Sequence, residues 1–260
     1  MSERVIQTSE NPFQRLMAER LADKEFDSQN IGVIAIGGLP GTGATSAAVD
    51  LETIITSETV IPVRTFSFEQ ERRRIYHELT GHYESPEGDS EREIQAGLTT
   101  DLFMAEQMIA PENSNSFVII DGRLGPYIAK KMLFAGRHLE SQGRLRCPLP
   151  FSVMTVYLYA TEGVRHARKF LQAVRQQPML NFDSYRDSLR AEVVEEQSTF
   201  SRAYPDLLGK TLNNMALQLG GEYLYDMRFD TSTHTSDEIA LNILNAQQAQ
   251  KLLSIPHLGT

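Results

Sequence analysis

The chain has 260 residues, enough for one large domain or two small ones, and its hydrophobic content of 41% suffices for a sizeable core. Its formal net charge of −9 argues against a nucleic-acid-binding surface, because nucleic-acid backbones are bound by clustered lysine and arginine. The single cysteine, Cys147, allows no intrachain disulfide, no apolar run has membrane-spanning length, and the N-terminus lacks the apolar core of a signal peptide. We therefore expect a cytoplasmic protein with no nucleic-acid and no membrane partner.

Strand and helix patterns alternate along most of the chain. Residues 1–30 are polar apart from a helical pattern over residues 12–24, and we expect this extension to dock on the body or on a protein partner. The predicted strands are residues 31–36, 60–66, 116–121, 152–160 and 222–230. The predicted helices are residues 45–56, 68–80, 91–109, a segment ending near residue 137, 162–176, 182–204, 206–219 and 236–253. An acidic loop over residues 83–90 and an insertion over residues 138–150 interrupt the alternation.

This alternation predicts an α/β fold, a three-layer sandwich with a mostly parallel sheet, formed by residues 31–260. The first strand is apolar nearly throughout, as expected of a strand buried on both faces in the middle of such a sheet. Ligands bind beyond the carboxyl ends of parallel strands. The segments at those ends should therefore converge on one cleft, and they are residues 38–45, 64–67, 121–123 and 230–232.

A glycine-rich turn links the first strand to the following helix and reads G-L-P-G-T-G-A-T from Gly38. This is the spacing of a phosphate-binding P-loop, in which backbone N–H groups and the positive end of the helix dipole face a phosphate. The predicted phosphate-binding residues are Gly38, Leu39, Pro40, Gly41, Thr42, Gly43, Ala44, Thr45 and Ser46. The loop departs from the pattern at one position, because Ala44 stands where a lysine normally reaches the β- and γ-phosphates. Losing one such preorganised donor costs about 3–4 kcal/mol of transition-state stabilisation.

Asp121-Gly122-Arg123 follows the third predicted strand. A carboxylate at this position beside a P-loop holds Mg²⁺ or orients the nucleophile, so Thr45 and Asp121 are the candidate metal ligands. Arg123 offers a planar donor pair for a phosphate. Taken alone, the same three residues are also an ordinary strand-ending turn with a surface arginine.

Further arginines flank the predicted cleft. The run from Arg72 to Arg74 spreads around its helix, so at most one or two of its side chains face the cleft, and such runs are often solvated faces. The arginines of the later helices are expected to be surface charges, and they are Arg165, Arg168, Arg186 and Arg190.

Three blocks of the chain resemble the cytidylate kinase family, in particular its compact archaeal-type branch of nucleoside monophosphate kinases. They are I-A-I-G-G-L-P-G-T-G-A-T-S-A-A at 34–48, V-I-I-D-G-R-L-G-P-Y-I-A at 118–129, and Y-D-M-R-F-D-T-S at 225–232 with the helix start that follows. The resemblance covers about residues 31–245 and implies a P-loop kinase fold with a helical lid near residues 177–205. It implies ATP and Mg²⁺ as cofactors, with ATP phosphates on the loop from Gly38 to Thr45.

The resemblance also implies roles for four arginines. Arg123 and one of the run that includes Arg72 and Arg73 would hold the acceptor monophosphate, and Arg190 is what remains of an arginine-rich lid. The later basic cluster of that lid is replaced here by Glu-Gln-Ser-Thr at 196–199. Asp121, Arg123 and Arg190 are accordingly the candidate catalytic residues.

Two functions remain open from the sequence. One is a nucleoside monophosphate kinase of the cytidylate type, which transfers a phosphoryl group from ATP to a small acceptor. The other is a catalytically degenerate relative that binds a nucleotide or a small phosphorylated ligand, or that serves as a scaffold for a protein partner. The second function follows from the missing P-loop lysine and the depleted lid, because phosphoryl transfer depends on positioning and neutralising charge.

Overall fold

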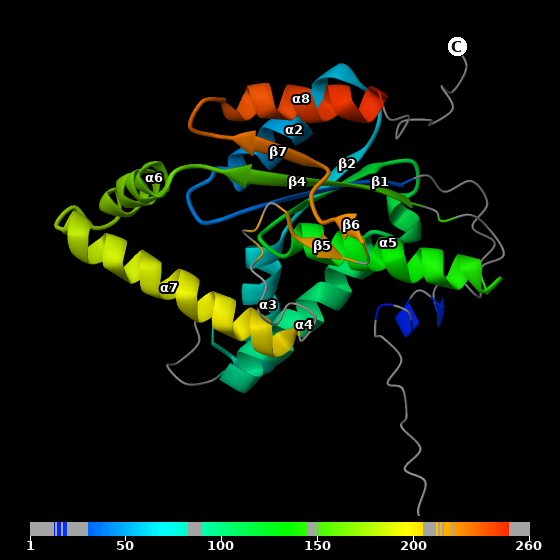
Figure 1. Cartoon of the computed structure of the whole chain (residues 1–260), viewed down its shortest axis with the longest axis horizontal. Coiled ribbons are helices and arrows are strands. Elements are labelled where there is room, and N and C mark those ends of the chain that lie inside the picture. Colours follow the sequence, from blue (N-terminus) through cyan, green and yellow to red (C-terminus); the bar gives the residue numbers. More distant parts are fainter. Residues whose placement is uncertain are drawn as a thin grey trace, which may run out of the picture.

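A five-stranded parallel sheet forms the centre of the protein (Figure 1). The structure is a computed structural model, and it describes residues 31–82, 90–144, 149, 151–204, 212, 214, 216–219 and 221–249, together with 13, 15, 16, 18 and 19. The strands run in the order β2-β3-β1-β4-β7, and all four strand pairs are parallel. Their bounds are β1 (Ile31–Gly38), β2 (Val63–Ser67), β3 (Phe117–Asp121), β4 (Phe151–Tyr159) and β7 (Met227–Asp230). The predicted α/β fold with a parallel sheet is confirmed.

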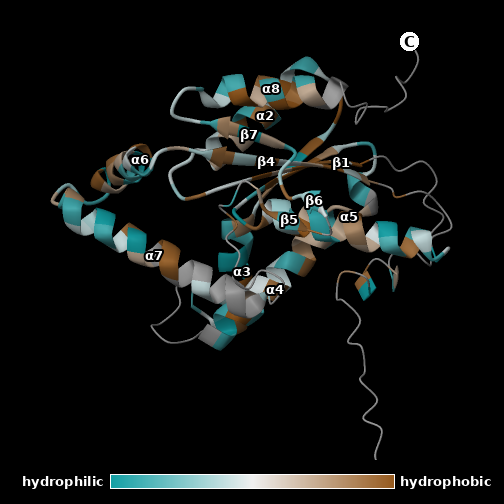
Figure 2. Cartoon of the chain, in the orientation of Figure 1, coloured by the Kyte–Doolittle hydropathy of each residue, from teal (hydrophilic) through white to brown (hydrophobic). Residues whose placement is uncertain are grey.

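Strand β1 lies in the middle of the sheet, as its apolar sequence predicts. Its side chains alternate between the two faces, so that Val33 and Ala35 join one core cluster while Ile34 and Ile36 join the other. Helices α2 (Ala44–Glu58) and α8 (Ser236–Ala249) cover the face of Ile34 and Ile36. Figure 2 shows apolar residues concentrated along the strands and on the inner sides of these helices.

The opposite face is covered chiefly by α5 (Gly125–Ser141), with α4 (Ser90–Gln107) and α3 (Phe68–Thr80) beside it (Figure 1). The N-terminal extension also contributes to this core, because Phe13 and Leu16 are buried against it. The docking of the extension on the body is thus confirmed for those two side chains. A short 3-10 turn, η1 (Pro111–Asn113), leads into β3.

Helices α6 (Glu162–Val174) and α7 (Phe182–Ala203) follow β4 and extend beyond the carboxyl ends of the strands (Figure 1). Aromatic contacts join them, since the ring centroid of Phe170 lies 5.1 Å from that of Phe182 and 5.9 Å from that of Tyr185. Helix α7 occupies most of the predicted lid region. No helix among the described residues has the length and apolarity that a membrane crossing requires.

The C-terminal part differs from its prediction. The predicted helix over residues 206–219 is wrong at its end, because Gln218–Leu219 form strand β5, which pairs antiparallel with β6 (Glu222–Tyr223). The predicted strand 222–230 is therefore two strands, β6 and β7, separated at Asp226. Helix α5 continues to Ser141, four residues past its predicted end. The acidic loop over residues 83–89 and the part of the insertion at 145–148 lie outside the described residues.

A polar cluster centred on Asp226 lies between β6 and β7. Its Oδ1 accepts a hydrogen bond of 2.8 Å from Lys130 Nζ, and its Oδ2 accepts two more of 2.8 Å each from the backbone N–H and the hydroxyl of Thr155. Lys130 comes from α5 and Thr155 from β4. This cluster fixes the point at which β7 joins the sheet.

Candidate phosphate-binding site

The glycine-rich loop leaves β1 at Gly38 and enters α2 at Ala44 in a conformation that depends on its glycines. Gly41 and Gly43 have φ angles of +84° and +85°, which side chains disfavour. A Cβ atom on Gly38 would lie 2.6 Å from the carbonyl oxygen of Leu158, so the backbones of β1 and β4 meet too closely there for any side chain. Thr42 is buried inside the loop, and its N–H donates to the carbonyl oxygen of Leu39 at 3.1 Å.

The first turn of α2 has N–H groups available for an anion. Gly43 is the N-cap of α2, and no side chain caps this end of the helix. Amides at an uncapped helix start are donors for phosphate, supported by the helix dipole. Ala44 contributes no charge, and its methyl group packs against the core cluster beneath α2.

The two predicted metal ligands lie together. The Thr45 hydroxyl donates a hydrogen bond of 2.7 Å to Asp121 Oδ2, at the end of the neighbouring strand β3. Burial raises the pKa of Asp121, and the bond from Thr45 partly offsets this shift. A hydroxyl and a carboxylate beside phosphate-binding amides are the oxygen ligands that Mg²⁺ takes together with substrate phosphates, so the residues fit this ion. No group of three or more His, Cys, Asp or Glu side chains suited to a metal occurs among the residues that the structure describes.

Arg123 and Arg165 approach the same site from different elements. Arg123 follows β3, and its carbonyl oxygen would lie 3.4 Å from a Cβ atom on Gly37. Arg165, near the start of α6, directs Nη1 towards the carbonyl oxygen of Pro40 at 3.5 Å. Both positive charges act on the buried Tyr157, whose pKa is raised by burial and lowered by the two guanidinium groups. The Arg165 side chain therefore contacts the loop, the charge of Arg123 acts on the same tyrosine, and no cation comes from position 44.

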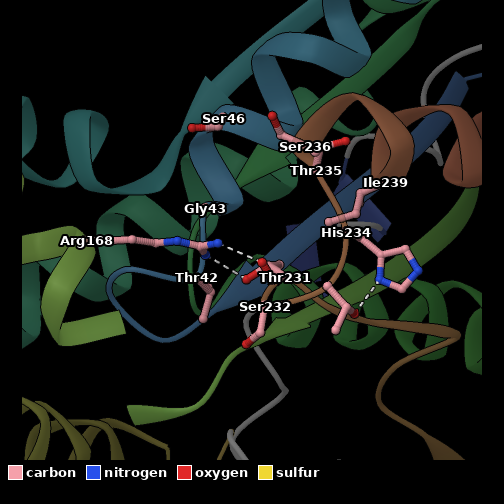
Figure 3. A pocket seen from close by; sticks show the side chains of 11 residues that line it. Thr42, Gly43, Ser46, Arg168, Thr231, Ser232, His234, Thr235, Ser236 and Ile239 are labelled. Atoms are coloured by element: carbon pink, nitrogen blue, oxygen red, sulfur yellow. Dashed lines mark hydrogen bonds between the residues drawn. The ribbon is translucent and has the colours of Figure 1, made fainter. Parts of the chain in front are cut away.

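A cavity of about 400 Å³ lies next to the loop, between the starts of α2 and α8 (Figure 3). Arg168 forms one wall, and its guanidinium donates to the hydroxyl of Thr231 at 2.9 Å and to the carbonyl oxygen of Thr231 at 2.7 Å. The segment after β7 forms the opposite wall. The remaining lining residues are Thr42, Gly43, Ser46, Ser232, Thr233, His234, Thr235, Ser236 and Ile239.

The segment after β7 is held by local hydrogen bonds. The N–H of Ser232 donates to Asp230 Oδ1 at 2.8 Å. Thr235 and Glu238 form a capping box at the start of α8, in which the N–H of Thr235 donates to Glu238 Oε2 at 2.9 Å. Hydrogen bonds within residues 230–238 therefore hold this wall of the cavity in place.

The structure brings some predicted residues to the site and places others elsewhere. The loop from Gly38 to Ser46 lies there with Asp121 and Arg123. Arg72 and Arg73 instead form ion pairs with Glu69 on their own helix, at 3.5 Å and 2.8 Å. Arg190 pairs with Glu162 of α6 at 2.6 Å.

Arg165 and Arg168 were expected to be surface charges, and Arg168 is exposed, but both side chains also contact the site, at Pro40 and at Thr231. The sequence signal for them is their spacing of three residues, which places both side chains on one face of a helix that begins at a strand end. The cavity wall at Thr231 and Thr235 carried a signal as well, since T-x-x-E after a strand marks a helix start.

No protein-family profile matches the chain, and no curated protein matches it. Among solved structures, it is similar to a candidate kinase from Chloroflexus aurantiacus, with 17% identity, a TM-score of 0.46, and coverage of 85% of this chain and 98% of that chain. It is also similar to the APS kinase of Mycobacterium tuberculosis, with 13% identity, a TM-score of 0.42, and coverage of 85% and 99%. The shikimate kinase of Acinetobacter baumannii has 15% identity, a TM-score of 0.40, and coverage of 85% and 94%. All three are distant likenesses to proteins described as kinases.

Proposed function

We propose that the protein is a P-loop phosphotransferase that moves a phosphoryl group from MgATP to a small acceptor, with a nucleoside monophosphate of the cytidylate type as the first candidate. The observation that carries this proposal is the Thr45–Asp121 pair beside the uncapped start of α2. This pair joins a candidate Mg²⁺ site to a candidate phosphate site, and phosphoryl transfer needs both.

In this proposal the nucleotide lies along the loop and into the cavity. The amides from Gly41 to Thr45 would hold the phosphates. The base would occupy the cavity of about 400 Å³, where the guanidinium plane of Arg168 offers a stacking surface and the hydroxyl groups offer hydrogen bonds. The volume lies within the range of small-ligand pockets.

Mg²⁺ supplies charge neutralisation for the transferring phosphoryl group when it is bound. Thr45 and Asp121 would hold it directly or through water. The buried Asp121 carboxyl is fixed by its bond to Thr45, so this ligand is preorganised rather than recruited from solvent. Arg123 would orient the acceptor at the end of β3.

The acceptor is the less supported part of the proposal. Arg72 and Arg73 are engaged with Glu69, so a monophosphate held from α3 would have to compete with these pairs. Both pairs are exposed, and such pairs contribute only about 0–1 kcal/mol each. Phosphate binding could therefore displace them.

The second candidate function is nucleotide binding without turnover. Ala44 favours it, because a cation at that position normally neutralises charge in the transition state. Arg190 does not separate the two functions, because its pair with Glu162 is as exposed as those of Arg72 and Arg73.

A coupled ATP-consumption assay with CMP, UMP, AMP and dCMP, together with titration calorimetry of MgATP, tests both functions. Turnover that is lost in Asp121→Asn supports the phosphotransferase. Binding of MgATP without turnover of any acceptor would support the second function. Absence of MgATP binding at millimolar concentration would overturn both.

A further inference from the structure

Arg165 is built into the wall of the phosphate loop. A Cβ atom on Gly41 would lie 2.5 Å from the Arg165 carbonyl oxygen and 3.0 Å from its Cα, so the backbones of α6 and the loop touch. The side chain turns back over the same loop, with Nη1 3.5 Å from the carbonyl oxygen of Pro40. A cation from α6 thus stands against the loop that lacks its own.

The Arg165 guanidinium has no carboxylate partner in the described part of the chain. Glu162, one turn earlier on α6, is the acidic side chain nearest along the helix, and its Oε1 is engaged by Arg190 at 2.6 Å. Among the described residues the Arg165 guanidinium has one hydrogen bond, to the Pro40 carbonyl oxygen, and its length of 3.5 Å is at the outer limit of such contacts. This cation therefore retains most of its capacity to bind an anion.

The charge of a second arginine also acts on Arg165. Burial lowers the pKa of Arg165, Glu162 and Tyr157 act in the opposite direction, and Arg123 lowers it further. Like charges that act on each other in a half-buried place repel. An anion between them would remove this repulsion, whereas a purely structural arginine would gain from having a carboxylate there.

We propose that Arg165 supplies the phosphate-binding cation that position 44 lacks, and that its ligand is the polyphosphate chain of a nucleoside di- or triphosphate lying on the loop from Gly38 to Thr45. This inference rests on the proposed function for the identity of the ligand. Arg165 reaches the loop from outside, through the Gly41 contact, rather than from the first turn of α2.

The position of Arg168 is consistent with this assignment. It follows Arg165 by three residues, so both side chains leave the same face of α6. Arg165 contacts the loop, and Arg168 lines the cavity beside it. Helix α6 thus supplies two arginines to one nucleotide: Arg165 for its phosphates and Arg168 for the cavity proposed for its base.

The first experiment is titration calorimetry of the full chain with inorganic tripolyphosphate and with MgADP. Arg165→Ala should weaken both affinities ten- to a hundredfold. Arg165→Lys should weaken them less, because lysine keeps the positive charge but lacks the planar donors of arginine. Arg175→Ala is the matched control, because it removes the same charge at the far end of α6 and should leave both affinities unchanged. Equal melting temperatures of the four proteins confirm that each variant is folded.

The second experiment tests whether a lysine at position 44 can replace the charge of Arg165. Ala44→Lys in the Arg165→Ala background should restore at least half of the lost affinity on a logarithmic scale, whereas Ala44→Lys alone should give less than a fivefold gain. A wild-type affinity for tripolyphosphate that Arg165→Ala leaves unchanged overturns the inference while the proposed function stands. Anion binding that depends on Arg165, in a protein that turns over no acceptor, supports the inference and removes the phosphotransferase proposal. Absence of anion binding in the wild type overturns the inference too.

Discussion

The Thr45 hydroxyl donates a hydrogen bond of 2.7 Å to Asp121 Oδ2, and this bond links the first turn of α2 to the end of β3 across 76 residues of sequence. It sets the distance between the helix start and the strand end at which the candidate metal site lies. The bond also orients the carboxylate towards the loop, so Thr45 has both a structural and a ligand role.

Thr45→Val should therefore weaken MgADP binding about tenfold and leave the binding of metal-free ADP nearly unchanged. The hydroxyl acts through the metal in this account, and one charge-assisted contact is worth about 1.5 kcal/mol. Thr45→Ser keeps the hydroxyl and serves as the control. Calorimetry with and without EDTA makes the comparison, and an equal loss in both conditions would contradict the metal role.

Gly41 and Gly43 offer a matched pair for loop stability. Both have φ near +85°, but a Cβ atom on Gly41 would strike the Arg165 carbonyl, whereas nothing lies within 4 Å of one on Gly43. Gly43→Ala should lower the free energy of unfolding by about 1 kcal/mol, from backbone strain alone. Gly41→Ala should lower it by at least about 2 kcal/mol, because strain and displacement of α6 add. Urea unfolding measures the free energy of unfolding of both variants. Equal losses would mean that α6 moves aside for the Gly41→Ala methyl group without loss of stability.

Arg168→Ala should lower the affinity for ATP about tenfold and leave the affinity for tripolyphosphate unchanged. Arg168 lines the cavity proposed for the base, and it lies beyond the phosphate loop. The substitution also removes its bonds to Thr231. A parallel loss for tripolyphosphate would place Arg168 on the phosphates instead of the base.

Asp101 should make stability depend on pH. Burial raises its pKa from 3.8 to about 8, and a hydrogen bond from Tyr204 acts against this shift. Because the folded-state pKa lies above the unfolded value, the unfolded chain loses its proton first as pH rises. The free energy of unfolding should therefore fall between about pH 4 and pH 8, by up to about 1.4 kcal/mol per pH unit from this group.

Asp101→Asn tests the assignment, because an amide cannot ionise and still accepts a bond from Tyr204. The stability of the variant relative to the wild type should rise steadily from pH 4 to pH 8 and then level off. Thermal unfolding at one-unit pH intervals measures the difference. A difference that stays constant across this range would show that Asp101 is not the titrating group.

The fold could be predicted because its determinants are local. The apolar residues 31–36 indicate a central strand, and the spacing of the glycines that follow is typical of a phosphate-binding loop. The polar contacts of Asp226 could not be predicted, since their partners Lys130 and Thr155 lie 96 and 71 residues away in the sequence.

The arginines show the same limit within the site. The pairing of Arg72 and Arg73 was readable, because Glu69 lies three and four residues before them on a helix. The spacing of Arg165 and Arg168 places them on one helix face, but the contact of Arg165 with Gly41 was not readable, because it arises only when the end of β4 is placed beside β1. The sequence reveals ion pairs within one helix, because the partners are three or four residues apart. A contact between a cation and a loop of another element depends on the order of the strands in the sheet.

The cluster of Lys130, Thr155 and Asp226 holds β7 at its beginning, and at its other end Thr231 bonds to Tyr159 of β4 and to Arg168 of α6. Only Met227–Asp230 separates this anchor from Thr231, a span of about 13 Å at roughly 3.3 Å per strand residue. The outer wall of the cavity is therefore held from two sides, by the Lys130–Asp226 ion pair at the start of β7 and by Arg168 at Thr231.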